Sequence, residues 1–210
     1  MFITLEGPEG SGKTSQLPPL ADFLRQQGYD VLTTREPGGT DIGEQIRQVL
    51  HRLDNTAMHP RTEALLFQAA RAQLVEQVIW PHLRRGGVVL SDRYADATLA
   101  YQGYGHGLDL AQVSAIIAFA TGGLKPALTV LLDVDVEVGL QRKAQCREWN
   151  RLDGYTVAFH RRVREGYHLL AQAEPQRWVT IDASQPPERV QEALRAVILE
   201  RLQRGQPLPR

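Results

Sequence analysis

The feature that most constrains this chain is a glycine-rich stretch near its amino end. Residues 7–14 read GPEGSGKT, fit the pattern GxxxxGK[ST] and directly follow the apolar run Phe2–Leu5. A loop of this kind turns tightly so that its backbone amides approach phosphate oxygens, and side chains at the glycine positions would obstruct that approach. The apolar run predicts a strand and the residues after the loop predict a helix, whose positive amino end favours anions. We therefore predict a P-loop that binds nucleotide phosphates.

Each residue of this loop is a candidate to contact ATP. Lys13 is expected to bridge the β- and γ-phosphates and the Thr14 hydroxyl to ligate Mg²⁺, because the pattern reserves these positions for those roles. The alternative is a glycine-rich turn without a ligand. The predicted ATP-binding residues of the loop are Gly7, Pro8, Glu9, Gly10, Ser11, Gly12, Lys13 and Thr14.

Short apolar runs alternate with amphipathic stretches along the whole chain, which is typical of an α/β fold. Helical spacing of apolar residues predicts helices over Ala64–Val78, Tyr155–Ala173 and Pro187–Leu202. The runs lack clean alternation, as in strands buried on both faces of a parallel sheet. We predict a single domain, residues 1–210, with a five-stranded parallel sheet and helices on both faces. The predicted strands are Phe2–Leu5, Val31–Thr34, Val88–Ser91, Leu128–Leu132 and Trp178–Ile181.

Charge and composition exclude several classes of protein. The 210 residues include 24 basic and 24 acidic side chains, and this balance argues against a nucleic-acid partner. No apolar run approaches the roughly 18 residues needed to cross a bilayer, and Glu6 and Glu9 fall where a secretory signal would be hydrophobic. The single cysteine, Cys146, cannot form an internal disulfide. We expect a cytoplasmic protein without a membrane partner.

Arginines follow the second and third predicted strands. Arg35 comes after the run Val31–Thr34, and Asp92 and Arg93 come after Val88–Ser91. The carboxyl ends of parallel strands meet at one edge of a sheet, so both guanidinium groups could grip one acceptor phosphate there. Asp92 is expected to hold Mg²⁺ through water. The alternatives are an ordinary surface arginine at Arg35 and an internal pairing of Asp92 with Arg93.

A P-loop by itself indicates a nucleotide but no particular reaction. A regulatory GTPase would carry further signatures, and the sequence contains neither NKxD nor DxxG. A second anion site facing the P-loop favours a kinase whose acceptor already bears a phosphate group.

The chain resembles the thymidylate kinase family, which phosphorylates dTMP. The segments LEGPEGSGKT, TREPGGT, LLFQAARAQLVE, SDRYADATLAYQG, KPALTVLLDV and IDAS occur in family order and spacing, and they cover essentially residues 2–200. The resemblance implies a P-loop kinase fold with a short mobile lid, transfer of the ATP γ-phosphoryl group to dTMP, dependence on Mg²⁺, a place in dTTP synthesis, and a homodimer.

The resemblance also implies how the acceptor is bound. Phe67 matches an aromatic that stacks on thymine, and Arg71 matches the residue that bonds the base O4; without the resemblance, Phe67 would be a core residue and Arg71 a solvent-facing one. Tyr101 matches the residue that fills the place of a 2′-hydroxyl, and Glu9 the one that meets the 3′-hydroxyl. The expected dTMP-binding residues are Glu9, Arg35, Phe67, Arg71, Arg93, Thr98, Tyr101 and Gln102.

The polar stretch Gln141–Asp153 corresponds to the lid in this family. There Arg142 matches the residue that packs on adenine, and Arg151 matches a lid arginine that reaches the transferring phosphoryl group; the alternative is a charged helix face. The chain departs from the usual lid in having Asn150 before that arginine and an extra Arg147. Asp182 and Ser184, after the last strand, match the loop that lines the adenine pocket, and residues 204–210 are expected to be a flexible tail.

The predicted reaction is therefore direct, in-line phosphoryl transfer from ATP to dTMP, without an enzyme-bound phosphate. Two alternatives remain at this point: a P-loop kinase for another nucleotide or nucleoside, and a nucleotide-dependent switch without small-molecule turnover. The predicted catalytic residues are Lys13, Arg35, Asp92, Arg93 and Arg151, with Thr14 and Asp92 as candidate ligands of Mg²⁺.

Overall fold

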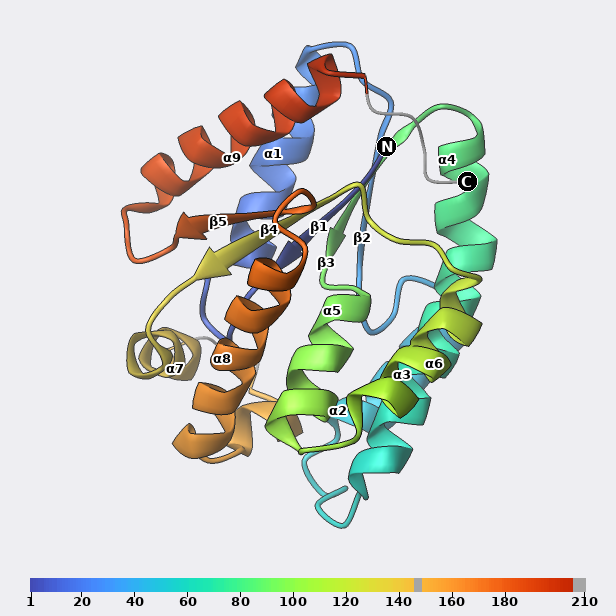
Figure 1. Ribbon diagram of the computed structural model, residues 1–210, viewed down its shortest axis with the longest axis vertical. Coiled ribbons are helices and arrows are strands. Elements are labelled where there is room, and N and C mark those ends of the chain that lie inside the picture. Colours follow the sequence, from blue (N-terminus) through green and yellow to red (C-terminus); the bar gives the residue numbers. More distant parts are fainter. Residues whose placement is uncertain (146–148, 206–210) are drawn as a thin grey trace.

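The computed structural model describes residues 1–145 and 149–205. Five parallel strands form one sheet in the order β2-β3-β1-β4-β5, which confirms the predicted fold class (Figure 1). Each strand runs one residue further toward its carboxyl end than predicted, because the polar residue there still pairs with its neighbour. The strands are β1 (Phe2–Glu6), β2 (Val31–Arg35), β3 (Val88–Asp92), β4 (Leu128–Asp133) and β5 (Trp178–Asp182).

Helices cover both faces of the sheet, as the unalternating strands require. On one face α1 (Lys13–Gln26) packs against α9 (Pro187–Gln203), and their apolar side chains join Ile3 and Leu5 of β1 in a buried cluster (Figure 1). On the other face, α8 (Val157–Ala173) contacts β4 and β5. The strands therefore have apolar partners on both sides, which explains their continuous hydrophobic character.

Part of the remaining helical structure covers the sheet face opposite α1, since residues 60–84 place Leu74, Ile79 and Leu83 in a buried cluster with Phe2 of β1 and Val89 of β3. The predicted helix over Ala64–Val78 is an α-helix, α3, followed by a π-helical turn, η1, and residues 99–105 form a second π-helical stretch. These elements are α2 (Asp41–His51), α3 (Pro60–Leu74), η1 (Val75–Ile79), α4 (Trp80–Arg84), α5 (Ala95–Thr98), η2 (Leu99–Gly105), α6 (Leu110–Thr121), α7 (Val136–Ala144) and η3 (Arg151–Gly154).

Helix α8 begins two residues later than its pattern predicts. The Thr156 side chain accepts a hydrogen bond from the Phe159 backbone N–H at 3.2 Å, so Thr156 is the N-cap and Val157 the first helical residue. A side-chain oxygen at this position satisfies a backbone donor that the first turn leaves unpaired. The later start leaves Tyr155 outside the helix, where its hydroxyl contacts Arg151 and Glu63.

The sheet register brings the polar strand ends together. Arg35 of β2 pairs with Asp92 of β3, and Leu5, just before the end of β1, pairs with Asp92 on the other side. The P-loop follows β1 at this same edge. The predicted donor and acceptor groups therefore share one edge of the sheet, which is where open α/β sheets bind ligands.

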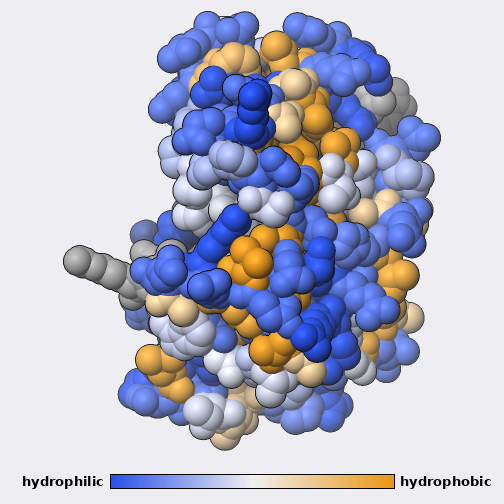
Figure 2. All heavy atoms as spheres, turned by 90° about the vertical axis from the view of Figure 1, so that its left-hand side faces the viewer, coloured by the Kyte–Doolittle hydropathy of each residue, from blue (hydrophilic) through white to orange (hydrophobic). Residues whose placement is uncertain are grey.

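Within the described part of the chain, no helix combines the length and apolar character that a membrane crossing requires. The face seen in Figure 2, the side of Figure 1 that carries α7, α8 and α9, is mostly hydrophilic with smaller apolar groups between. Of the predicted tail, residues 206–210 lie outside the described residues, and Arg204 forms an ion pair with Glu200 at the end of α9.

Candidate active site

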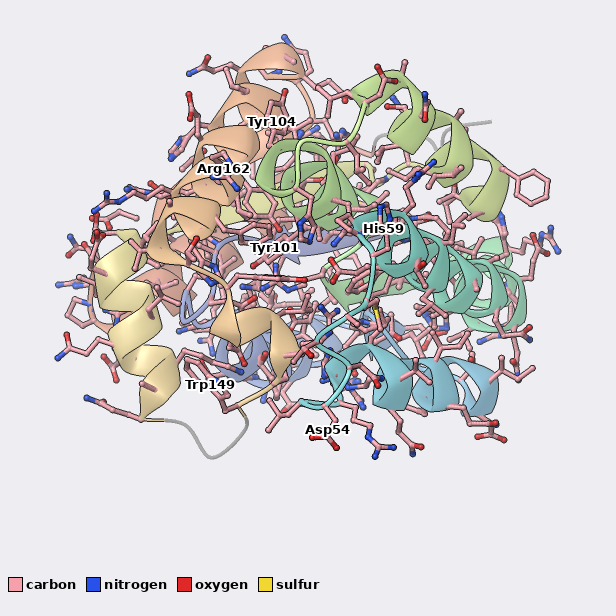
Figure 3. The ribbon with its side chains drawn as sticks, turned by 90° about the horizontal axis from the view of Figure 1, so that it is seen from below. Asp54, His59, Tyr101, Tyr104, Trp149 and Arg162 are labelled. Carbon is pink, nitrogen blue, oxygen red and sulfur yellow. The ribbon has the colours of Figure 1, made fainter. Side chains whose placement is uncertain are left out.

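A cleft of about 1210 Å³ opens where the P-loop, the ends of β2 and β3, α3 and η2 meet. Figure 3 looks at this side of the molecule from below, with Tyr101 near its centre and Trp149 toward its lower edge. The cleft brings together most of the predicted site residues from both the donor and the acceptor sides. Those that line it are Glu9, Gly10, Ser11, Gly12, Lys13, Thr14, Arg35, Phe67, Arg71, Asp92, Arg93, Thr98, Tyr101, Gln102 and Arg142.

The ammonium group of Lys13 is enclosed by its own loop. It donates hydrogen bonds to the carbonyl oxygens of Gly7 (3.0 Å) and Pro8 (2.9 Å) and to the Ser11 hydroxyl (2.9 Å). Burial and the neighbouring Arg93 guanidinium lower the pKa of Lys13 to about 8. The group is therefore mostly protonated at neutral pH and would gain from a nearby anion.

Helix α7 rests directly on the P-loop because two glycines meet there. A Cβ atom on Gly10 would overlap the backbone of Gly139, and a Cβ on Gly139 would overlap the Glu9 carbonyl oxygen. Gly10 also has φ of 68°, in the left-handed region that favours glycine. The loop is thus braced from outside by a backbone-to-backbone contact that no other residue type permits.

Thr14 and Asp92 lie together at the mouth of the loop. The Thr14 hydroxyl donates to Asp92 Oδ2 at 2.6 Å, and both residues line the cleft. A hydroxyl beside a carboxylate is an oxygen set that suits Mg²⁺, which usually takes one or two protein ligands plus substrate phosphates and water. No group of three or more His, Cys, Asp or Glu side chains that could hold a metal occurs among the described residues. The donor set therefore fits a magnesium ion carried by a nucleotide rather than a closed protein cage.

Glu9, Arg93 and Tyr101 form a hydrogen-bonded group beside the P-loop. Arg93 donates to Glu9 Oε1 at 2.6 Å and to the Tyr101 hydroxyl at 3.1 Å, and that hydroxyl donates to Glu9 Oε1 at 2.7 Å. Burial alone would raise the pKa of Glu9, but the charges of Arg93 and Lys13 hold it at about 2. Arg93 has φ of 68°, a strained value for a residue with a side chain, and such strain gathers at functional sites.

Arg71 is almost fully buried, with 1% of its surface exposed, so the alternative that it faces solvent is wrong. Its Nε and Nη2 atoms both donate to Glu36 Oε2, at 2.8 and 2.5 Å, and Nη2 also donates to the Tyr94 carbonyl at 2.9 Å. Its Nη1 atom donates to Gln68 Oε1 and Thr98 Oγ1. These contacts occupy all five N–H groups of a guanidinium, so a base carbonyl would have to share one of them.

The other predicted acceptor groups reach the cleft from separate elements. Phe67 is half-buried in the wall formed by α3, and Gln102 is buried in the wall formed by η2. The Arg35 side chain is half-exposed and forms an ion pair with Glu44 at 3.0 Å. Arg35 and Arg93 thus line the same cleft, as predicted. In this conformation each forms an ion pair with a carboxylate of the protein, Arg35 with Glu44 and Arg93 with Glu9.

The residues predicted for the adenine side also come together. Arg142 donates to the carbonyl oxygens of Ala183 (2.8 Å) and Ser184 (3.4 Å) in the loop after β5. Asp182 caps the same loop, since its Oδ1 atom accepts from the Ser184 backbone N–H at 2.9 Å. Arg142 lines the cleft, whereas Asp182 and Ser184 lie beyond the lining residues.

The Arg151 side chain does not line the cleft in this conformation, and its contact with the transferring phosphoryl group stays a prediction. It donates to Glu63 Oε2, to the Leu50 carbonyl and to the Tyr155 hydroxyl. A capping box formed by Asn150 and Asp153 fixes the start of η3, and a buried carboxylate at Glu63 then captures the guanidinium. In this conformation Arg151 anchors η3 against α2 and α3. The extra arginine of the lid, Arg147, lies outside the described residues.

The comparisons with known proteins agree with this geometry. The family model described as thymidylate kinase matches residues 5–194. The chain belongs to the thymidylate kinase family. It is 54% identical to a thymidylate kinase of Thermomicrobium roseum over 99% of both chains, and 51% identical to one of Deinococcus radiodurans over 96% of this chain and 97% of that one. A crystal structure of thymidylate kinase from Ehrlichia chaffeensis superposes with a TM-score of 0.77 at 32% identity, covering 95% of this chain and 98% of that chain.

Membership of the thymidylate kinase family confirms the predicted resemblance and fold, but the cleft also contains residues that the sequence analysis did not single out. Arg47 and His51 line it from α2, and Lys143 and Trp149 line it from the lid segment, residues 141–153. Burial and the charge of Arg47 lower the pKa of His51 to about 4, so this imidazole is neutral at physiological pH. Lys143 follows Gly139 by one helical turn and therefore shares the face of α7 that meets the P-loop. That spacing was the one available signal for Lys143.

Proposed function

We propose that this chain transfers the γ-phosphoryl group of ATP to dTMP, giving ADP and dTDP, by direct in-line displacement. The observation that carries the proposal is the single cleft whose lining combines Lys13 of the P-loop with Arg93, Tyr101 and Arg71. The acceptor phosphate is already an anion, so the reaction needs no strong general base. Catalysis then consists of positioning two anions and stabilising the charge that moves between them.

On the donor side, the P-loop amides and Lys13 are proposed to hold the ATP phosphates. Thr14 and Asp92 would hold Mg²⁺, which supplies charge neutralisation on the phosphate oxygens when bound. Arg142 is proposed to pack on adenine beside the loop that contains Asp182 and Ser184. Lys143 of the lid segment also lines the cleft, and its charge helps to lower the pKa of Glu9 in the P-loop.

On the acceptor side, the proposed roles follow from what each element presents to the cleft. Phe67 would stack on the base, with Arg71, Thr98 and Gln102 at its polar edge. Tyr101 and Glu9 would meet the sugar, because the hydrogen bond between them joins η2, which carries Gln102, to the P-loop. The acceptor phosphate is proposed to lie between Arg35 and Arg93, and binding would exchange their present carboxylate partners for phosphate oxygens.

We also infer a homodimer and a cytoplasmic enzyme that supplies dTDP for dTTP synthesis. The support for the homodimer is the outer face of α6, where Phe119 is 92% exposed, and the neighbouring α3, where Leu65 is 57% exposed. Large side chains at such exposure form an apolar face without a partner in one chain, and such faces mark contacts between proteins. A second copy of this chain is the partner that the family resemblance favours.

The experiment that tests the function is an acceptor panel. The enzyme is assayed with ATP and Mg²⁺ against dTMP, dUMP, dCMP, dGMP and thymidine, with ADP release coupled to a dye. Turnover is expected with dTMP at the highest kcat/KM and none with thymidine, which lacks the acceptor phosphate. Preference for thymidine or for a purine nucleotide would support another acceptor class, and slow ATP hydrolysis unaffected by every acceptor would indicate a switch.

A further inference from the structure

The side chain of Glu63 joins the acceptor pocket to the end of the lid segment and to Tyr155 just after it, although Glu63 is not among the residues that line the cleft. It projects from α3 and is fully buried, with 0% of its surface exposed. Its two carboxylate oxygens serve different neighbours. Oε1 accepts from Gln102 Nε2 at 2.8 Å and lies 3.1 Å from His106 Nε2, whereas Oε2 accepts from Arg151 and from the Tyr155 hydroxyl at 2.8 Å.

The Glu63 carboxyl group is ionised, so it can only accept hydrogen bonds. Burial alone would raise the pKa of Glu63, but the hydrogen bonds from His106, Arg151 and Gln102 lower it to about 2. An ionised carboxylate has no proton to donate. Only the NH₂ end of the Gln102 amide can therefore face Glu63, and the two ends of that amide are not interchangeable.

The opposite end of the same amide is left for a ligand. Gln102 is 1% exposed, lies in the wall of the cleft and sits on the π-helical stretch η2, a type of helix that is frequent at functional sites. Within residues 1–145 and 149–205, no hydrogen bond reaches Gln102 Oε1, whereas all five donors of the nearby Arg71 are occupied. A carbonyl oxygen held in this way is an acceptor ready for a donor from the cleft.

We propose that Glu63 is a positioning residue for acceptor selection: by binding the NH₂ of Gln102, it turns the Gln102 carbonyl oxygen toward the imide N–H of the acceptor base. Thymine and uracil carry a hydrogen on ring nitrogen N3, and cytosine carries a lone pair there. A fixed carbonyl oxygen therefore bonds the first two bases and repels the third. The proposal rests on the proposed function, because it takes dTMP as the acceptor.

The test uses Glu63→Gln, which keeps the shape of the side chain but can either donate or accept. The Gln102 amide is then free to turn over and offer its NH₂ to the base. Steady-state kinetics with dTMP and dCMP should show KM for dTMP raised about tenfold, KM for ATP changed by less than about twofold, and the dTMP-to-dCMP ratio of kcat/KM lowered about tenfold. The conservative variant Glu63→Asp keeps an acceptor-only group and should retain most of that ratio.

Tyr155→Phe is the matched control, because it removes one hydrogen bond to Oε2 and leaves Oε1 and Gln102 untouched. It should leave the dTMP-to-dCMP ratio within about twofold of the wild-type value. A role for Glu63 in stability alone would lower kcat/KM for both acceptors by the same factor, and that result would overturn the proposal. If the wild-type enzyme itself fails to phosphorylate dTMP, the proposed function has failed instead.

A second measurement covers the case in which Glu63→Gln does not fold. A crystal structure of the wild-type protein with dTMP should show one terminal atom of the Gln102 amide within hydrogen-bond distance of Glu63 and the other within that distance of base N3. A Gln102 side chain turned away from the base, or detached from Glu63, would contradict the proposal.

Discussion

At the scale of single residues, Glu6 and Glu9 lie three positions apart but differ in protonation state at neutral pH. Glu6 ends β1 in the interior, where it accepts hydrogen bonds from the Tyr94 backbone N–H and the Tyr167 hydroxyl, and burial together with Asp96 raises its pKa to about 8. Glu9 faces Arg93 and Lys13, which hold its pKa at about 2. The P-loop therefore carries one permanent negative charge beside its cations, and Glu6 beneath it is largely neutral at pH 7.

This difference predicts how stability depends on pH. A carboxyl group whose pKa is raised by folding binds its proton more tightly in the native state, so its contribution is greatest below pH 4.5 and is lost as pH rises toward about 8. A glutamine at this position cannot titrate, so Glu6→Gln should not lose this contribution. Between pH 5 and pH 9 the free energy of unfolding of the variant should therefore rise relative to that of the wild type by a few kcal/mol. Urea unfolding of both proteins across this range measures the difference. Parallel curves would show that Glu6 has an ordinary pKa.

Lys13 allows a sharp test of the donor site, because the chain has only three lysines, at positions 13, 125 and 143. Lys13→Ala removes the cation proposed to bridge the transferring phosphate and should lower kcat by about 10²- to 10³-fold. Lys125→Ala is the control, because Lys125 is 71% exposed and pairs only loosely with Glu174 at 3.9 Å. Coupled assays of ADP release measure kcat for both variants and the wild type. Equal kcat in Lys13→Ala and the wild type would show that Lys13 has no role in the mechanism.

The residues also show where sequence reasoning ends. The strand-end positions of Arg35, Asp92 and Arg93 were predictable, because parallel strands bring their carboxyl ends to one edge whatever the side chains do. The partner of Arg71 was not, because Glu36 lies 35 positions away in the sequence and only the packing of α3 over β2 brings them together. Helical spacing assigns charged residues to the solvent face, so it predicts an exposed side chain for a buried arginine such as Arg71.

At the scale of elements, short apolar runs predicted the strands and helical spacing predicted the long helices, but neither signal revealed the π-helical stretches. A π turn adds a residue to a helix without changing the type of residues in it, so η1 and η2 carry no signal at a period of 3.6. The position of η3 was equally hidden, because it depends on the contact of Arg151 with Glu63, 88 positions away. In this conformation the ion pair with Glu63 holds Arg151 outside the lining of the cleft.

The contact between α7 and the P-loop predicts an effect on ATP binding. Gly139→Ala would drive a methyl group into the Glu9 carbonyl oxygen, so either α7 or the loop must shift. We expect a loss of about 1–3 kcal/mol in stability and a rise in KM for ATP, with a smaller change in KM for dTMP. Thermal unfolding and initial-rate kinetics measure these effects.

The matched control for this contact is Gly154→Ala. Gly154 lies in η3 and an added Cβ there would meet no atom within 4 Å. Its KM for ATP should therefore equal the wild-type value. If Gly139→Ala behaves in the same way, the loop is not braced by α7 and the close approach has no role in binding.

At the scale of the whole molecule, the candidate site is assembled from segments spread over most of the chain. The P-loop, the ends of β2 and β3, α3, η2 and the lid segment each contribute residues to one cleft, while the opposite edge of the sheet contributes none to its lining. The fold was predictable because every segment repeats the same strand-to-helix pattern. The pairing between segments was not, since it depends on the angle at which each helix crosses the sheet.

The oligomeric state is the property of the whole molecule that a single substitution can test. Phe119 on α6 is 92% exposed, and Phe119→Glu would place a charge in the proposed interface at a large desolvation cost. Light scattering should give twice the chain mass of 23.5 kDa for the wild type and the single mass for the variant.

Leu169→Glu provides the comparison, because Leu169 is 42% exposed on α8, a different helix from α6. This variant should remain a dimer, since position 169 lies outside the proposed interface on α6 and α3. A wild-type mass of 23.5 kDa would refute the homodimer outright. A dimer that survives Phe119→Glu but not Leu169→Glu would move the interface to α8, and the exposed face of α6 would then need another partner.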